Sequence, residues 1–154
     1  MKELLEYRTS LIARVLAASQ EFCAACKAVN DPRTPIEDGW NLHQLAAHTR
    51  DVAMLVYGLR ARQTVMEENP VFQNFDQAAY NVEHYDANEP LSKILDEFMA
   101  SIAAQVEWMK ALPNEAWARE SRHERMGGGF TTQLWVERGL AHIEEHLASV
   151  RKAG

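Results

Sequence analysis

The last part of the chain, residues 131–150, reads TTQLWVERGLAHIEEHLASV. Its apolar residues recur in steps of four and three, which places them on one face of an α-helix. Thr131 or Thr132 can cap the start of this helix, because a threonine hydroxyl accepts a backbone N–H there. We therefore predict a helix over residues 131–151. The positions expected to face the core are Val136, Leu140, Ile143, Leu147 and Val150.

The same spacing recurs in three earlier segments, which predicts helices over residues 3–29, 41–63 and 90–112. Prolines after the first and third segments end those helices, since proline removes a backbone donor, and Asn41 is a suitable N-cap for the second. The positions expected to face the core are Leu4, Leu11, Val15, Ala18, Phe22 and Cys26 in the first helix, Leu45, His48, Val52, Leu55 and Leu59 in the second, and Leu91, Leu95, Phe98, Ile102, Met109 and Leu112 in the third.

The connections over residues 67–89 and 114–130 show neither sustained helical spacing nor the alternation of a strand, and we expect one short helical turn within the first. Gly127–Gly129 closes the second connection and is interpreted as a flexible linker, because it lacks the lysine and the preceding strand of a phosphate-binding loop. We predict an all-α fold: a four-helix bundle with longer connections before the third and fourth helices. A chain of 154 residues fits one such domain, residues 1–154.

Composition narrows the range of partners. Acidic residues outnumber basic ones by 22 to 16, giving a net charge of −6, and the basic residues are scattered, so nucleic acid is not expected as a partner. The first residues carry acids where a secretory signal needs a basic start. No apolar run reaches the roughly 18–20 residues of a membrane span. We expect a cytoplasmic protein without membrane contact.

Cys23 and Cys26 form the only CxxC pair. They lie inside a helical pattern, whereas a redox pair gains its reactivity at a helix N-terminus. One pair alone cannot complete a cysteine-rich zinc site. We interpret both as small, partly buried thiols.

Three histidines stand where they can cooperate. His142 and His146 are four residues apart, so both imidazoles project from one helix face, and His48 occupies a core-facing place in the second helix. Neutral imidazoles from two facing helices would make a three-nitrogen site with an open fourth position, as in catalytic zinc centres. We predict that these three residues bind one divalent metal ion, although hydrogen-bonded core histidines are the simpler alternative.

Two rival metal patterns fit less well. Residues 142–146 match the HxxEH pattern of inverted metalloproteases, with Glu145 as base, but so short a match arises easily by chance. A di-iron carboxylate bundle needs two Glu-x-x-His units, and the chain has one, ending at His123. We expect His43, His84 and His123 to serve surface or polar-network roles.

Residues near the predicted ligands supply candidate catalytic and pocket positions. Glu145, Arg138 and Asp51 lie within a turn of a ligand and would act as base, anion clamp and orienting residue, with ordinary helical surface charge as the alternative. Gly139 carries a helix cost of roughly 0.8–1.0 kcal/mol, which implies either close helix packing or space above a pocket. The aromatic residues expected to line the pocket are Trp40, Trp135, Tyr80 and Phe75.

The segment from Asp38 to His48, which reads DGWNLHQLAAH and is followed by Thr49-Arg50-Asp51, resembles the second helix of the DinB-like (YfiT-like) superfamily. The closing HxxxH of residues 142–146 is similar to that family's last helix. The resemblance implies a four-helix bundle, a three-histidine site for zinc, nickel or a similar ion, and frequent homodimers. It implies that the ligands are His48, His142 and His146. Relatives include S-transferases that use the thiol bacillithiol and a mycothiol-dependent maleylpyruvate isomerase.

The leading hypothesis is a metal-dependent hydrolase or transferase that acts on a small-molecule substrate, with a low-molecular-weight thiol as a possible cofactor. The first alternative is a non-catalytic module, a metal-loaded homodimer that binds a small ligand. The second is a helical interaction protein whose histidines only satisfy hydrogen bonds in the core.

Overall fold

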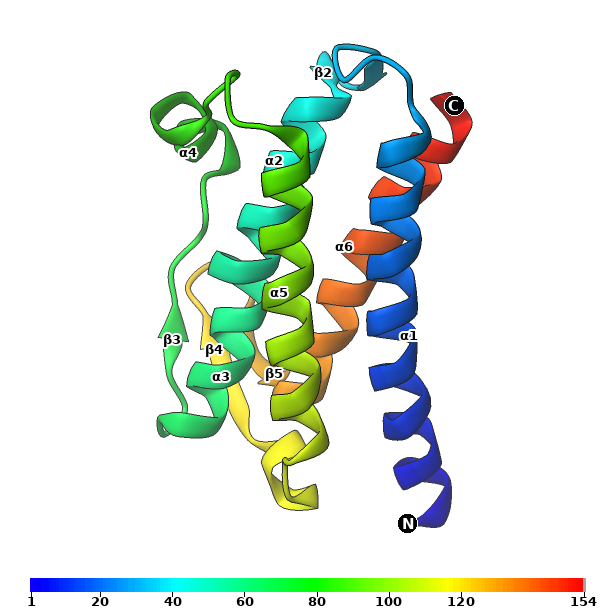
Figure 1. The fold of residues 1–154 in the computed structure, drawn as a ribbon. Coiled ribbons are helices and arrows are strands. Elements are labelled where there is room, and N and C mark those ends of the chain that lie inside the picture. Colours follow the sequence, from blue (N-terminus) through cyan, green and yellow to red (C-terminus); the bar gives the residue numbers. More distant parts are fainter. Residues whose placement is uncertain (154) are drawn as a thin grey trace.

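A computed structural model of the protein describes residues 1–153, and most of them are helical. Four long helical rods lie side by side (Figure 1). α1 packs on α5 and α6, and α2 packs on the same two helices. The predicted four-helix bundle is confirmed, with helix bounds within a few residues of those expected. The rods are α1 (Lys2–Ala28), a continuous run of α2 (Leu42–Val52), η1 (Ala53–Gly58) and α3 (Leu59–Met66), α5 (Leu91–Lys110) and α6 (Thr132–Ala153).

The prediction of an all-α fold is wrong in detail, because short strands lie in the connections, beside two short helices. One antiparallel hairpin precedes α2. A three-stranded sheet joins the two long connections, with β3 parallel to β4 and β4 antiparallel to β5. These elements are β1 (Pro35–Glu37), β2 (Trp40–Asn41), β3 (Val71–Phe72), α4 (Gln77–His84), η2 (Asn114–Ala118), β4 (Glu120–His123) and β5 (Gly127–Thr131).

The three-glycine run is part of strand β5, so the prediction of a flexible linker there is also wrong. Gly127 and Gly129 have φ angles of 88° and 83°, a left-handed backbone that glycine adopts without steric cost. The run thus shapes the turn between β4 and β5. Ser121 pairs with Phe130 across this hairpin.

A π-helical turn, η1, interrupts the second rod. A π turn inserts an extra residue, which rotates the following helix faces relative to the preceding ones. Leu55 and Leu59 were expected in the core, yet they are 39% and 44% exposed. Val56 and Ala61 are buried in their place. The turn also places Tyr57 against Gly139 of α6.

The core lies between the four rods and follows the predicted positions in α1, α5 and α6. Leu4 is an exception because it lies in the first turn of α1, where it is 37% exposed. Cys23 and Cys26 are both buried, as expected for thiols inside a helix. Burial raises the pKa of Cys23 to about 11 and that of Cys26 to about 12, so both remain protonated at neutral pH.

Replacing Gly58 with alanine should destabilise the fold. An added Cβ would lie 2.7 Å from the backbone oxygen of Ala53, which also accepts a hydrogen bond from Gln105. Overpacking outweighs the better helix propensity of alanine, so we expect a loss of about 1–2 kcal/mol in chemical denaturation. Gly128→Ala is the matched control, because the nearest atom there is the flexible end of the Arg122 side chain. A Gly58→Ala protein as stable as the wild type would contradict this account of η1.

Candidate metal centre

The three predicted histidines meet between α2 and α6. His142 Nε2 lies 3.2 Å from His48 Nε2 and 2.9 Å from His146 Nε2. All three atoms lie within 4.8 Å of one another. His48 and His146 are each 8% exposed, and His142 is half-buried. Three ring nitrogens from opposite ends of the sequence therefore face one common point.

The electrostatics of this cluster keep two of the imidazoles neutral. Burial, together with the charges of the neighbouring His146 and His48, lowers the pKa of His142 to about 3. Burial, followed by the charge of His146, lowers the pKa of His48 to about 4. Neutral imidazoles are the protonation state that a metal requires. The lone pairs of nitrogens packed this closely repel one another unless a proton or a cation lies between them.

Glu37 orients His146 from the end of β1. Its Oε1 lies 2.6 Å from His146 Nδ1, and its Oε2 accepts a hydrogen bond of 2.9 Å from the Ser149 hydroxyl. A carboxylate at Nδ1 holds the ring proton there, so the lone pair of Nε2 points into the cluster. Metal-binding histidines have such a partner in most proteins. Helical spacing gives no signal for Glu37, which lies outside the predicted helices.

The β1–β2 hairpin brings this carboxylate to the cluster. Asp38 and Gly39 have φ angles of 45° and 79°, as a tight hairpin turn requires. The turn pairs Glu37 with Trp40. The Asp-Gly pair, a strong hairpin signal, was available in the sequence and would have indicated this pairing. Asn41 then caps α2 as predicted, accepting a hydrogen bond of 2.8 Å from the backbone N–H of Gln44.

Two aromatic residues cover the cluster. Trp40, one of the predicted pocket aromatics, packs edge-on against His48, with ring centroids 4.6 Å apart. Tyr57, which the sequence analysis missed, lies with its ring centroid 5.6 Å from that of His142. Gly139 makes room for Tyr57, since a Cβ at Gly139 would lie 3.1 Å from the tyrosine Cβ. Close packing thus explains the glycine in α6, and it places Tyr57 beside the histidines.

Trp135 forms a deeper wall of the same region. It is 1% exposed, and its Nε1–H donates a hydrogen bond of 2.8 Å to the Ser121 hydroxyl. A narrow apolar cavity below the cluster is lined by Trp135, Tyr57 and His142, among others. Within residues 1–153, His142 Nδ1 is the one buried ring nitrogen of the cluster without a hydrogen-bond partner.

Tyr80 is not brought to the histidines. It stacks on His84, with ring centroids 4.1 Å apart, and lines a separate hollow with Arg50 and Asp51. Phe75 lies beside Tyr80 and lines yet another hollow, together with Tyr57 and Arg138. Of the four predicted pocket aromatics, Trp40 and Trp135 therefore lie at the cluster and its adjoining cavity.

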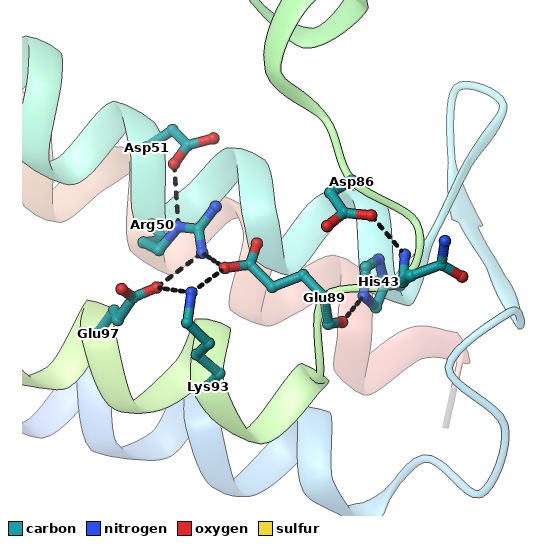
Figure 2. Close-up of polar contacts among 8 residues, drawn as sticks. His43, Arg50, Asp51, Asp86, Glu89, Lys93 and Glu97 are labelled. Atoms are coloured by element: carbon teal, nitrogen blue, oxygen red, sulfur yellow. Dashed lines mark hydrogen bonds and ion pairs between the residues drawn. The ribbon is translucent and has the colours of Figure 1, made fainter.

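Asp51 belongs to an ion-pair network between α2 and α5, shown in Figure 2. Arg50 Nε donates to Asp51 at 2.9 Å, and Arg50 Nη1 lies 2.8 Å from a Glu89 oxygen. Lys93 and Glu97 extend the same network. This network joins the two helices. Asp51 therefore pairs with Arg50 and does not orient one of the candidate histidine ligands.

The remaining predicted residues, Arg138, Glu145 and His43, lie outside the three-histidine cluster. Arg138 is exposed one turn before His142 on α6, with its guanidinium 5.2 Å from the ring centroid of Phe130. Glu145 is exposed on the same helix, and the carboxylate that contacts a candidate ligand is that of Glu37. His43 lies in a polar network: its Nδ1 is 2.6 Å from the Tyr85 hydroxyl, and its Nε2 is 2.6 Å from the Glu89 carbonyl oxygen, the second contact being drawn in Figure 2.

Comparison with known proteins agrees with the fold. The sequence profile of the DinB superfamily matches residues 30–150. The chain belongs to this superfamily. The matched DinB region contains the three histidines of the cluster and also Glu37 and Ser149. Among curated proteins, none is a significant sequence match.

A solved structure similar to this DinB superfamily member is that of YfiT from Bacillus subtilis. The two superpose with a TM-score of 0.86 at 20% sequence identity, over 96% of this chain and 86% of YfiT. YfiT is described as a probable metal-dependent hydrolase with an unusual four-helix bundle topology. At this identity the likeness shows a shared fold. Within residues 1–153, every helix is too short or too polar to span a bilayer.

Proposed function

We propose that His48, His142 and His146 bind one divalent metal ion, zinc or nickel, and that the protein is a metal-dependent hydrolase or transferase acting on a small molecule. The observation that carries the proposal is the convergence of three Nε2 atoms within 4.8 Å of one another. Burial keeps His48 and His142 neutral, which suits them to a cation. The donor set, three imidazoles with one oriented by a carboxylate, fits zinc and nickel.

Three protein ligands leave part of a metal's coordination sphere for a substrate or solvent molecule. An ion in such a site supplies a nucleophile near neutral pH by lowering the pKa of the molecule that fills the open position. The protein's own residues do the rest. Glu37 holds the His146 ring in one orientation, while Trp40 and Tyr57 restrict the access of water to the cluster.

The hydrolase alternative is supported by the description of YfiT, whose fold this chain shares. The transferase alternative, with a low-molecular-weight thiol as second reactant, rests on the sequence resemblance alone. The buried thiols of Cys23 and Cys26 do not supply that reactant, because both remain protonated within the core. A thiol would have to come from solution.

Metal content tests the proposal directly. We expect purified protein to bind about one zinc or nickel ion per chain, measured by elemental analysis after dialysis. His84→Ala is the matched control, because His84 is exposed and lies outside the cluster. This variant should bind the ion as the wild type does. Protein that takes up neither zinc nor nickel would contradict the proposal.

Activity separates an enzyme from a binding module. Chelator-treated protein should regain turnover on addition of zinc or nickel, tested on nitrophenyl esters for hydrolysis and on thiol conjugation to chlorodinitrobenzene for transfer. A metal-loaded protein that is stabilised by small ligands but turns none of them over would favour the non-catalytic alternative. Turnover that is unchanged in metal-free protein would contradict the role of the ion.

A further inference from the structure

A polar hollow of about 130 Å³ lies next to Tyr57. Segments from η1, α3, α6 and the β4–β5 hairpin surround it, together with the residues that follow β3. The side chains that give it its chemistry are Arg60, Arg138, His123, Asn74 and Gln77.

The two arginines of this hollow have no acidic partner. In residues 1–153, no carboxylate oxygen lies within 4.0 Å of either guanidinium, whereas Arg14 and Arg50 are both paired with glutamates. Arg60 is only 8% exposed; it stacks 4.9 Å from the Trp135 centroid and donates through Nη2 to the Gln73 carbonyl at 2.9 Å. A buried cation that lacks a counter-ion is unusual in a chain with a net charge of −6.

His123 adds a further donor. Its Nδ1 accepts hydrogen bonds from the backbone N–H groups of Arg125 and Met126, at 3.1 and 3.2 Å. The ring proton of the neutral imidazole is therefore on Nε2. Burial, followed by the charge of Arg60, lowers the pKa of His123 and favours this neutral form. The nearby Glu124 accepts the backbone N–H of Asn74 and does not line the hollow.

The hollow adjoins the histidine cluster. Tyr57 and Trp135 line both the hollow and the cavity at His142. Arg138 precedes His142 by four residues on α6, which places their Cβ atoms about 5–6 Å apart on one helix face. The two cations thus lie beside a residue whose ring packs against His142.

We propose that this hollow is an oxyanion subsite, in which Arg60, Arg138 and His123 bind the carboxylate or phosphate group of the substrate. The unpaired guanidiniums and an N–H donor converge on one small space, and planar guanidinium groups match the oxygens of such anions. As far as it concerns turnover, this inference rests on the function proposed above. It restricts the substrates to small anionic molecules whose reacting group lies next to Tyr57.

Anion binding can be measured without any knowledge of the substrate. Inorganic phosphate and acetate would be titrated into the metal-loaded protein, with affinity measured by calorimetry and contacts by NMR of the arginine Nε–H and histidine ring signals. Phosphate should shift the signals of Arg60 and His123. Arg138→Gln should weaken binding by roughly tenfold or more, the effect of one charge-assisted hydrogen bond. Acetate binding without phosphate binding would identify a carboxylate subsite.

Arg62→Gln is the matched control. Like Arg60, Arg62 lies on α3. Its guanidinium stacks 5.5 Å from the ring of Trp108, outside the hollow. Its replacement removes the same charge, and phosphate affinity should stay within about twofold. Arg138 is exposed, so Arg138→Gln is expected to fold, whereas Arg60→Gln would need a check by circular dichroism. Equal losses in Arg138→Gln and Arg62→Gln, or no binding of either anion to the wild type, would overturn the proposal.

The metal content of each variant distinguishes this proposal from the previous one. Arg138→Gln should keep its ion while losing the anion, because Arg138 does not contact the ligand atoms. A protein that binds phosphate through Arg138 but takes up no zinc or nickel would uphold the subsite and contradict the metal proposal. A metal-loaded protein that binds neither phosphate nor acetate would uphold the metal proposal and contradict the subsite.

Discussion

Replacing His142 with alanine should abolish tight metal binding. Its Nε2 is the central atom of the cluster, 3.2 Å from His48 Nε2 and 2.9 Å from His146 Nε2. Two imidazoles then remain where three were present. Loss of a partner that only orients a ligand costs 10–100-fold in metal affinity, so loss of a ligand should cost more than roughly 100-fold. Competition against a chromogenic zinc indicator measures this change.

Thermal unfolding gives a second measure of the same substitution. An ion at 100 times its Kd stabilises the folded protein by about 2.7 kcal/mol, and His142→Ala should lose this shift. Without metal the variant should unfold close to the wild type, because the cavity left by the ring is offset by removal of a buried, unpartnered Nδ1. His84→Ala should keep the metal-dependent shift. A His142→Ala protein that still melts higher with zinc would contradict the three-histidine site.

The parts of the fold that sequence predicts well are the regular helices. In α5 and α6 the apolar residues keep one spacing from end to end, so both the bounds and the buried face follow from the pattern. The second rod shows where such a pattern fails. Its period holds as far as Val52 and is then shifted by η1, which exposes Leu55 and Leu59. Leucines lie on both sides of the shift, so hydrophobicity alone did not reveal it.

The small sheet could not be predicted from local pattern. β3 has two residues, too few to display alternation, and its partner β4 lies about 50 residues later. Its stability comes from pairing across the chain and from packing against Trp135, through contacts with Phe72 and Phe130. Such long-range contacts leave no trace in the spacing of a single segment.

The candidate site likewise contains residues that helical spacing predicts and residues that it does not. His142 and His146 share a helix face by spacing, and His48 lies in a regular part of α2, so sequence alone could bring the three together. Glu37 and Tyr57 could not be found by helical spacing. The first reaches His146 through a hairpin, and the second faces His142 because the π turn rotates it inward. Residues that support the ligands therefore come from irregular segments, where periodicity carries no information.

Glu37→Gln should lower zinc or nickel affinity by about 10–100-fold while leaving the fold intact. A glutamine can still accept the proton of His146 Nδ1 at the position of Oε1, so the ring stays oriented. In the wild type, the negative charge of Glu37 increases the basicity of the imidazole and stabilises a cation bound at Nε2. The substitution removes that charge and therefore weakens binding of the cation. The Ser149 hydroxyl, which donates to Oε2 at 2.9 Å, can turn to accept from the new amide. Metal affinity from indicator competition and stability from urea unfolding are measured together.

Comparison with two other variants separates the charge of Glu37 from its geometry. Glu37→Ala removes both, so its metal affinity should fall below that of Glu37→Gln. Glu144→Gln is the matched control for charge, because Glu144 lies on α6 two residues before His146 and pairs with Arg14. If long-range charge alone mattered, Glu144→Gln and Glu37→Gln would weaken metal binding equally. We expect only Glu37→Gln to weaken it, since the carboxylate acts through its contact of 2.6 Å with Nδ1. Equal affinities for Glu37→Gln and the wild type would show that orientation of the ring, and not charge, is what Glu37 provides.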